Sequence, residues 1–174
     1  MRIAAVTLPR PAAEAEALVR RFKTRDPFRI AEGLGITVVL LDTLTHLRGF
    51  YKTVLRNSYL FLNSALSEEE RRVVCAHELG HARLHREVGG ALRLADGGDG
   101  RREYEANLFA AALLCPGHEI APLLLSGRSA TEVAALLGVD ENLVALAVSL
   151  LPHGEGQAPT YDHLFLASAP SGER

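Results

Sequence analysis

The chain has 174 residues, of which 48% are hydrophobic, and this size suits one folded domain with at most a small appendage. A formal net charge of −2 and the lack of a long basic run argue against general affinity for nucleic acids. Two cysteines are too few for a disulfide framework, and the apolar runs are too short to span a membrane. We therefore expect a cytoplasmic protein with no membrane partner.

The N-terminal third of the chain predicts two helices and then a strand. Residues 12–23 have the apolar spacing of an amphipathic helix, and residues 26–34 predict a second helix that opens with Asp-Pro and ends before a glycine. Residues 36–41 are rich in β-branched side chains and predict a buried strand.

The next segment predicts a β-hairpin. Residues 49–55 and 58–63 have strand composition, with the turn expected at Arg56 and Asn57. An edge strand can hold an extended peptide through backbone hydrogen bonds that tolerate many sequences. One strand of this hairpin is therefore a candidate binding site for an extended substrate.

A long helix should follow, beginning at a capping box. Ser67 can accept from the free amides of the first turn while Glu70 reaches back to the cap. Apolar residues continue with helical spacing until about Glu87, and Gly89 and Gly90 are expected to end the helix.

Within this helix, residues 77–81 have the sequence His-Glu-Leu-Gly-His, which is the H-E-x-x-H pattern. Histidines four apart on a helix share a face, with Cβ atoms about 5–6 Å apart, so His77 and His81 can bind one divalent metal. Glu78 is then placed to activate a water on that metal. The alternative is a pair of partly buried histidines that are satisfied by hydrogen bonds alone.

A third ligand is expected, because a catalytic zinc usually has three protein ligands and one open position. Residues 102–114 predict a second helix, on which Glu103 and Asn107 share a face with small alanines. This face should pack closely on the first helix, so that Glu103 completes the site and Asn107 accepts the spare N–H of a ligating histidine. Glu105 points away from Asn107 and is predicted to be solvated. Zinc is the default for two histidines and a glutamate, although manganese is possible.

His85 lies four residues after His81 on nearly the same face of the predicted helix. At a rise of 1.5 Å per residue it is about 12 Å from His77 along the axis, too far to share the metal. We expect it to cap the end of the helix or to contact a ligating residue from outside the metal site.

These segments resemble the ImmA/IrrE family of metallopeptidases. The resemblance rests on A-H-E-L-G-H at residues 76–81 and E-x-x-A-N-x-F-A at residues 103–110, and it covers roughly residues 14–150. It implies an α+β fold with a small zincin-like domain, in which a short antiparallel sheet packs on the H-E-x-x-H helix beside a second metal-binding helix. It also supports His77, His81 and Glu103 as the ligands of a gluzincin-like peptidase site. The implied substrates are helix-turn-helix repressors, whose cleavage derepresses genes of mobile elements or stress responses.

The C-terminal part predicts three short helices, over residues 120–125, 130–137 and 140–151. We interpret residues 1–118 as the peptidase domain, residues 119–151 as a helix-turn-helix-like unit packed on it, and residues 152–174 as a terminal strand or tail. The last of the three helices has no lysine or arginine from residue 141 to residue 151, so direct DNA binding is not expected. Packing, or docking of a repressor substrate, is the favoured role of this unit.

The sequence thus predicts a metalloendopeptidase in which Glu78 takes a proton from the activated water and passes it to the leaving amine. Tyr104, Tyr161 and His85 are candidate donors to the oxyanion of the transition state. Two alternatives stay open: a metal-stabilised anti-repressor that grips its partner without cutting it, and a DNA-binding regulator.

Overall fold

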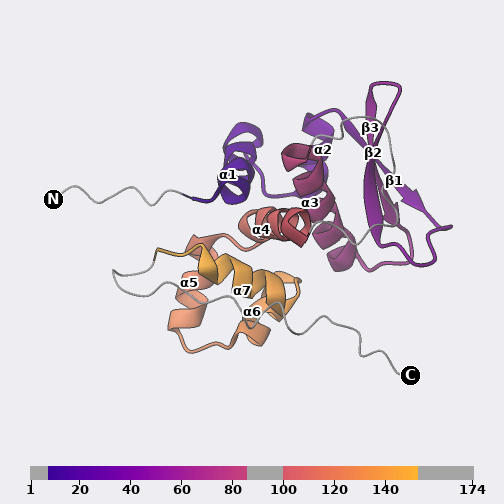
Figure 1. Ribbon diagram of the computed structural model, residues 1–174. Coiled ribbons are helices and arrows are strands. Elements are labelled where there is room, and N and C mark those ends of the chain that lie inside the picture. The colour runs from indigo at the N-terminus through magenta and orange to yellow at the C-terminus, as the bar shows by residue number, and fades with distance from the viewer. Residues whose placement is uncertain (1–7, 86–99, 153–174) are drawn as a thin grey trace.

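The computed structural model describes residues 8–85 and 100–152. Within them the helices and strands are α1 (Arg10–Phe22), α2 (Pro27–Gly33), β1 (Ile36–Leu41), β2 (Gly49–Val54), β3 (Asn57–Asn63), α3 (Glu68–Leu84), α4 (Gly100–Leu114), α5 (Gly117–Leu125), α6 (Ala130–Leu137) and α7 (Glu141–Ser149) (Figure 1). The predicted α+β class is confirmed. Gly89 and Gly90, which were expected to end the long helix, and the terminal strand or tail lie outside the described residues.

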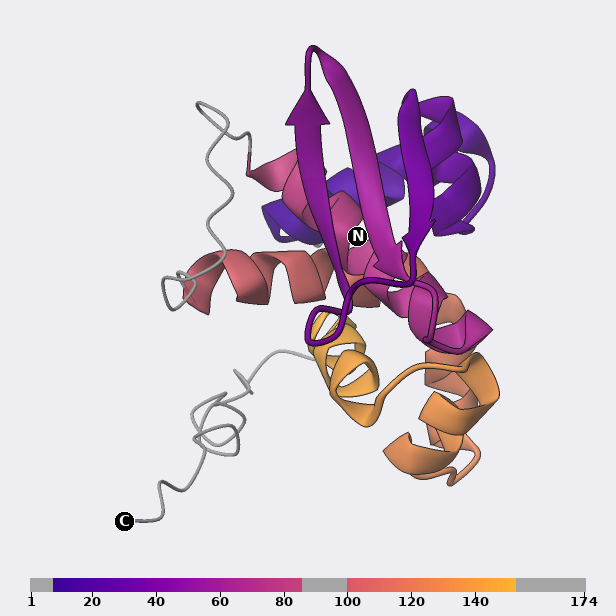
Figure 2. The same cartoon turned by 90° about the vertical axis from the view of Figure 1, so that its right-hand side faces the viewer.

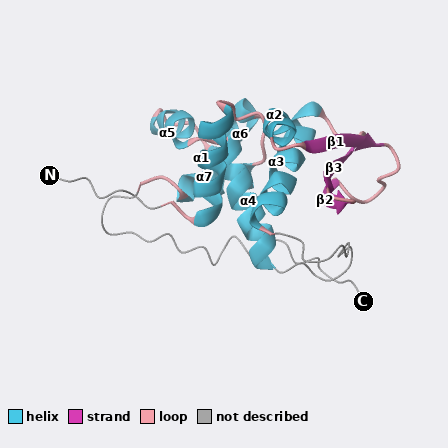
Figure 3. Ribbon diagram, turned by 90° about the horizontal axis from the view of Figure 1, so that it is seen from above, coloured by secondary structure: helices cyan, strands magenta, loops and turns pink. Residues whose placement is uncertain are grey.

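The elements form layers, with the sheet on one side of the molecule and the helices stacked behind it (Figures 1 and 3). Helix α3 packs on β2 and β3, and α4 lies against α3. Helices α1 and α7 in turn pack on α4. When the sheet faces the viewer, all the helices lie behind it or below it (Figure 2). Helix α3 therefore has one side for the sheet and another for α4.

The sheet has three strands in the order β1-β3-β2 and is mixed. Strands β2 and β3 form the predicted antiparallel hairpin, but β1 pairs in parallel with β3. The expectation of an antiparallel sheet was wrong for β1, because the chain passes from β1 to the far edge before it returns through the centre. Strand β1 is also less buried than predicted, since it too is an edge strand and Leu40 is 49% exposed.

The hairpin turns one residue earlier than predicted, at Leu55 and Arg56. Both residues have positive φ, 48° and 69°, as a two-residue hairpin turn of type I′ requires. Asn57, which the sequence placed in the turn, is the first residue of β3. The turn thus forms with two residues that rarely adopt this conformation, so strand pairing outweighs the local preference.

Helix α3 begins with the predicted capping box. The Glu70 amide donates to Ser67 Oγ at 3.2 Å, and the Ser67 amide donates to Glu70 Oε2 at 2.9 Å. The helix ends at Leu84, three residues earlier than expected, and His85 is its C-cap, with φ −121° and ψ 79°. The end of α3 therefore falls next to the histidines that carry the motif.

The C-terminal helices join the same hydrophobic core as the rest of the chain. Val133 of α6 and Val144 of α7 are fully buried in the cluster that also contains Leu79 of α3. The boundary at residue 118 stays a prediction. No single described helix is long and apolar enough to cross a membrane, although α4 and α5 pass that test as a pair bent by 77°.

Candidate metal centre

Two elements bring the three predicted ligands together. His77 and His81 lie on α3, and Glu103 lies in the first turn of α4. The Nε2 atoms of the two histidines are 3.0 Å apart. Each of them is 3.3 Å from an oxygen of Glu103, Oε2 for His77 and Oε1 for His81. Three donor side chains from two helices thus converge on one point.

This donor set fits a divalent metal. A tetrahedral site with metal–ligand bonds of about 2.0–2.1 Å has edges of about 3.3 Å. The two nitrogen donors are 3.0 Å apart, and each lies 3.3 Å from an oxygen donor. Two imidazoles and one carboxylate leave a fourth position open, which distinguishes a catalytic zinc site from a structural one.

Asn107 fixes the orientation of His77. Its Oδ1 lies 2.8 Å from His77 Nδ1, one turn of α4 beyond Glu103. The amide oxygen can only accept, so Nδ1 carries the proton and the lone pair of Nε2 faces the metal position. The structure thus places Asn107 in the contact that the sequence predicted.

The close approach of α3 and α4 depends on Gly80. A Cβ atom at residue 80 would lie 3.0 Å from the Cα atom and 3.1 Å from the carbonyl oxygen of Ala106. Any larger side chain there would push the helices apart and separate Glu103 from the histidines. The sequence interpretation assigned this packing to alanines of α4 and overlooked Gly80, the variable position just before His81. A glycine in mid-helix is unfavourable for helix formation, and this was the available signal.

Glu78 is held at the edge of the sheet. The backbone N–H of Tyr51, on β2, donates to its Oε2 at 3.1 Å. Burial raises the pKa of Glu78, and the negative charge of Glu103 acts in the same direction, while His77 and the Tyr51 amide oppose them. A carboxylate with a raised pKa accepts a proton more readily, as a general base must. Sequence reasoning missed the contact with Tyr51, which joins two elements far apart in the chain.

The pKa values of the three candidate ligands are shifted in different directions. The pKa of His77 is raised, because its hydrogen bond to Glu103 and the nearby carboxylates outweigh the opposing effect of burial. Burial, together with the charge of His77, lowers the pKa of His81 to about 4. The pKa of Glu103 is lowered, chiefly by its hydrogen bond to His77. In the metal-free site, His77 therefore becomes a charged imidazolium before His81 does, and Glu103 stays ionised.

Comparison with known proteins assigns the chain to a family. Residues 31–149 match the IrrE N-terminal-like domain of the peptidase M78 family. The chain belongs to this family. The resemblance to ImmA/IrrE metallopeptidases is thereby confirmed, and the H-E-x-x-H helix and the helix with Glu103 both lie inside the matched region.

One curated protein and one solved structure are similar to this chain. The chain is 34% identical over 137 residues to "Uncharacterized immunity region protein 2" of Bacillus phage phi105, covering 77% of this chain and 86% of that protein. A solved structure of a Mycobacterium tuberculosis transcriptional regulator has a similar fold, with a TM-score of 0.60 and 20% identity. The similarity covers 83% of this chain but 48% of the regulator, so the chain spans about half of its length.

The environment of Glu105, on α4, differs from the prediction. It accepts a hydrogen bond from His85 Nε2 at 3.0 Å and one from Arg101 Nε at 3.0 Å. The prediction that it is solvated was wrong, because the helical wheel considered the face toward His77 and left out His85. His85 caps α3 as expected, and its Nδ1 lies 3.1 Å from Nδ1 of His81.

These contacts leave fewer candidates for the donor to the oxyanion. Both ring nitrogens of His85 are engaged, one with His81 and one with Glu105. His85 is therefore a poor donor to an oxyanion. Tyr104 lies half-buried next to Glu103 on α4. Tyr161 lies outside the described residues.

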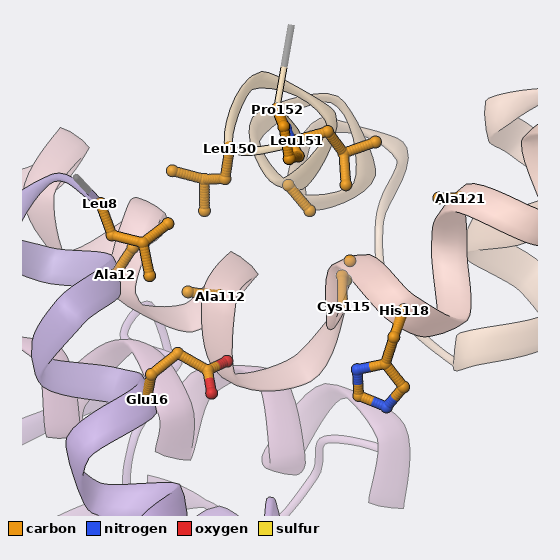
Figure 4. Close-up of a pocket in the computed structure, with 12 residues that line it drawn as sticks. Leu8, Ala12, Glu16, Ala112, Cys115, His118, Ala121, Leu150, Leu151 and Pro152 are labelled. Atoms are coloured by element: carbon orange, nitrogen blue, oxygen red, sulfur yellow. The ribbon is translucent and has the colours of Figure 1, made fainter. Parts of the chain in front are cut away.

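A separate apolar pocket lies at the other end of α4 (Figure 4). Its volume is about 350 Å³, and α1, α4, α5 and α7 contribute its walls. Leu8, Ala112 and Leu151 are among its mainly aliphatic lining. None of the candidate metal ligands lines this pocket, so it is distinct from the metal centre.

Proposed function

We propose that the protein is a metal-dependent endopeptidase that cleaves a helix-turn-helix transcriptional repressor. The observation that carries the proposal is the convergence of His77, His81 and Glu103, with Glu78 beside them on α3. Membership of a peptidase family and the relative from a phage immunity region support it.

The residues divide the chemistry among them. His77, His81 and Glu103 would hold zinc, or manganese in its place, since imidazole and carboxylate ligands discriminate weakly between these metals. The metal supplies a Lewis acid that lowers the pKa of water and polarises the scissile carbonyl. Glu78 accepts the proton of the attacking water and delivers it to the leaving amine. The Tyr51 N–H, at 3.1 Å from Glu78, keeps the carboxylate oriented for both transfers.

Strand β2 is the binding strand for an extended substrate. Within the described sheet it is an edge, whereas β3 is central and paired on both sides. Val54 and Asn57 flank the two-residue turn and form a hydrogen-bonded pair, so every second residue along β2 turns its backbone groups away from β3. Gly49, Tyr51 and Thr53 are these residues, and the bond from Tyr51 to Glu78 agrees with this direction. A substrate strand beside β2 would lie next to Glu78.

Family membership and the immunity-region context of the phage relative support this substrate class. Loss of a repressor would switch on genes of a mobile element or a stress response. Helix α7 carries no basic residue, so we expect the enzyme to bind its repressor through protein contacts, without binding DNA directly. We also propose that this encounter takes place in the cytoplasm.

The test is incubation with the purified product of any neighbouring helix-turn-helix gene, followed by mass analysis of fragments. Reactions contain zinc, manganese or a chelator, and a parallel series uses the Glu78→Gln variant. We expect fragments with metal and wild-type protein, and none with the variant or the chelator. If the variant inactivates the repressor as well as the wild type does, the chain is an anti-repressor that acts without proteolysis.

A further inference from the structure

A chain of hydrogen bonds leads outward from His81, on the side opposite to its metal-facing nitrogen. His81 Nδ1 lies 3.1 Å from His85 Nδ1, and His85 Nε2 lies 3.0 Å from Glu105 Oε2. The other oxygen of Glu105 accepts from Arg101 Nε at 3.0 Å. The side chains of His85 and Glu105 are 11% and 21% exposed, so water competes little for these bonds.

The direction of every proton in this chain follows from one requirement. A metal on His81 Nε2 needs the lone pair there, so the proton of His81 resides on Nδ1 and is donated to His85. His85 Nδ1 is then an acceptor, and its own proton is on Nε2, facing the carboxylate of Glu105. Each link thus has one donor and one acceptor, and no other arrangement of neutral rings satisfies all of them.

We propose that His85 and Glu105 are positioning residues that hold His81 in its metal-binding tautomer and increase its electron donation to the metal. This inference rests on the proposed metal centre. Partners on the outer nitrogen of a ligating histidine fix the ring and raise its basicity, and their loss typically lowers metal affinity about 10–100-fold.

The two ligating histidines are therefore supported differently. His77 donates to the neutral amide of Asn107, whereas the chain from His81 ends on a carboxylate. Glu103 and Glu105 lie on the same helix and engage different histidines of α3, Glu103 those at the metal position and Glu105 the one beyond it. Helix α4 thus supplies one ligand directly and strengthens another through His85.

The experiment measures zinc affinity by competition with a chromophoric chelator, and the visible absorption of the cobalt-substituted protein. Neither readout depends on peptidase activity. His85→Phe removes both links, and we expect its zinc affinity to fall about 10–100-fold with shifted cobalt bands. His85→Asn restores an acceptor near His81 but does not reach Glu105, so it should recover part of the loss. Glu105→Gln keeps an acceptor and loses the charge, so its effect should be smaller.

Arg83→Gln is the matched control. Arg83 lies in the same last turn of α3 and forms an ion pair with Glu14 at 2.7 Å, without contacting His81. This variant should keep the zinc affinity and cobalt spectrum of the wild type. Nitrogen NMR of the zinc-loaded protein should also show the proton of His81 on Nδ1.

The outcomes separate the positioning role of His85 and Glu105 from the metal centre itself. If the wild-type protein binds no zinc, both the metal centre and the positioning role are overturned. If the wild type binds zinc and the His85 variants bind it equally well, the positioning role alone is overturned. An equal loss of zinc affinity in Arg83→Gln also overturns the positioning role, because fraying of the helix end would then explain the effect. A loss of zinc affinity that is largest in His85→Phe and smaller in His85→Asn and Glu105→Gln, with Arg83→Gln unaffected, supports the positioning role.

Discussion

The two halves of α4 differ in what surrounds them. The N-terminal half carries Glu103 and Asn107 toward α3, and Glu103 is half exposed. From Leu108 to Leu114 every residue is buried, against α1 on one side and α7 on another. The first half has the polarity of a site, and the second has the all-round apolar character of a core helix.

The candidate metal site and the packed core therefore share one helix. We call His77, Glu78, His81, Glu103 and Asn107 the polar cluster. We call residues 108–114, with the buried side chains of α1 and α7 around them, the apolar layer. Glu103 and Asn107 lie in the first two turns of α4, whereas the apolar layer begins after them along the same helix. Substitutions in the two should therefore have separable effects.

The largest expected effect is on the polar cluster. Glu103→Gln removes the anionic ligand, so zinc affinity should fall by more than the roughly 100-fold upper range for an outer partner. Because Glu103 is half exposed, the free energy of unfolding of the metal-free protein should change by no more than about 0.5 kcal/mol. Chelator competition and urea unfolding measure the two quantities. Glu119→Gln, an exposed glutamate in the first turn of α5, is the control and should leave both unchanged. Equal zinc affinity in Glu103→Gln would remove Glu103 from the site.

The apolar layer should show the opposite pattern. Leu113 is fully buried, so Leu113→Ala should lower the free energy of unfolding by about 2–5 kcal/mol. The zinc affinity of the folded protein should stay the same, because Leu113 is outside the polar cluster. Leu125→Ala is the same change at an 88% exposed site, and should cost at most about 0.5 kcal/mol. A loss of affinity in Leu113→Ala at temperatures where it is folded would contradict the separation.

The polar cluster could largely be anticipated from the sequence, because it depends on spacing along helices. The four-residue intervals between His77 and His81, and between Glu103 and Asn107, set which side chains share a face before any tertiary structure is known. The structure brings the three candidate ligands within 4.8 Å of one another. The capping box of α3 is equally local and was also predicted correctly.

Contacts that depend on how elements meet could not be anticipated. The bond from Tyr51 to Glu78 requires the sheet edge to lie against α3, and the pairing of Glu105 requires the end of α3 to lie beside α4. The parallel pairing of β1 depends on the path of the chain between strands. No periodicity encodes these arrangements, and sequence spacing along one helix gave the wrong environment for Glu105.

Gly80 lies between the two regions and should affect the site more than the fold. In Gly80→Ala the new Cβ would lie 3.0 Å from Ala106, so α3 and α4 must separate by a few tenths of an ångström. Overpacking costs about 1–3 kcal/mol, but alanine favours a helix over glycine by about 1 kcal/mol, so the net loss of stability should be small. Zinc affinity and cleavage rate should still fall, up to about tenfold, because Glu103 moves relative to the histidines. Gly100→Ala, where an added Cβ meets nothing within 4 Å, is the control and should leave both at the wild-type level. A large loss of stability with normal zinc affinity would contradict this role.

The smallest effect concerns pH and tests how the polar cluster holds protons. Metal binding requires neutral imidazoles, so protons compete with zinc. The pKa of His77 is raised and that of His81 is lowered to about 4, so above about pH 5 His81 is a neutral imidazole and His77 is the histidine that takes up the extra proton in the metal-free site. As the pH falls from 7.5 to 5.5, zinc affinity should decrease by no more than about tenfold per unit, the limit for one displaced proton. A slope near one hundredfold per unit would mean that both histidines are protonated together. In Glu78→Gln one of the charges that raises the pKa of His77 is lost, so the decrease should begin at a lower pH.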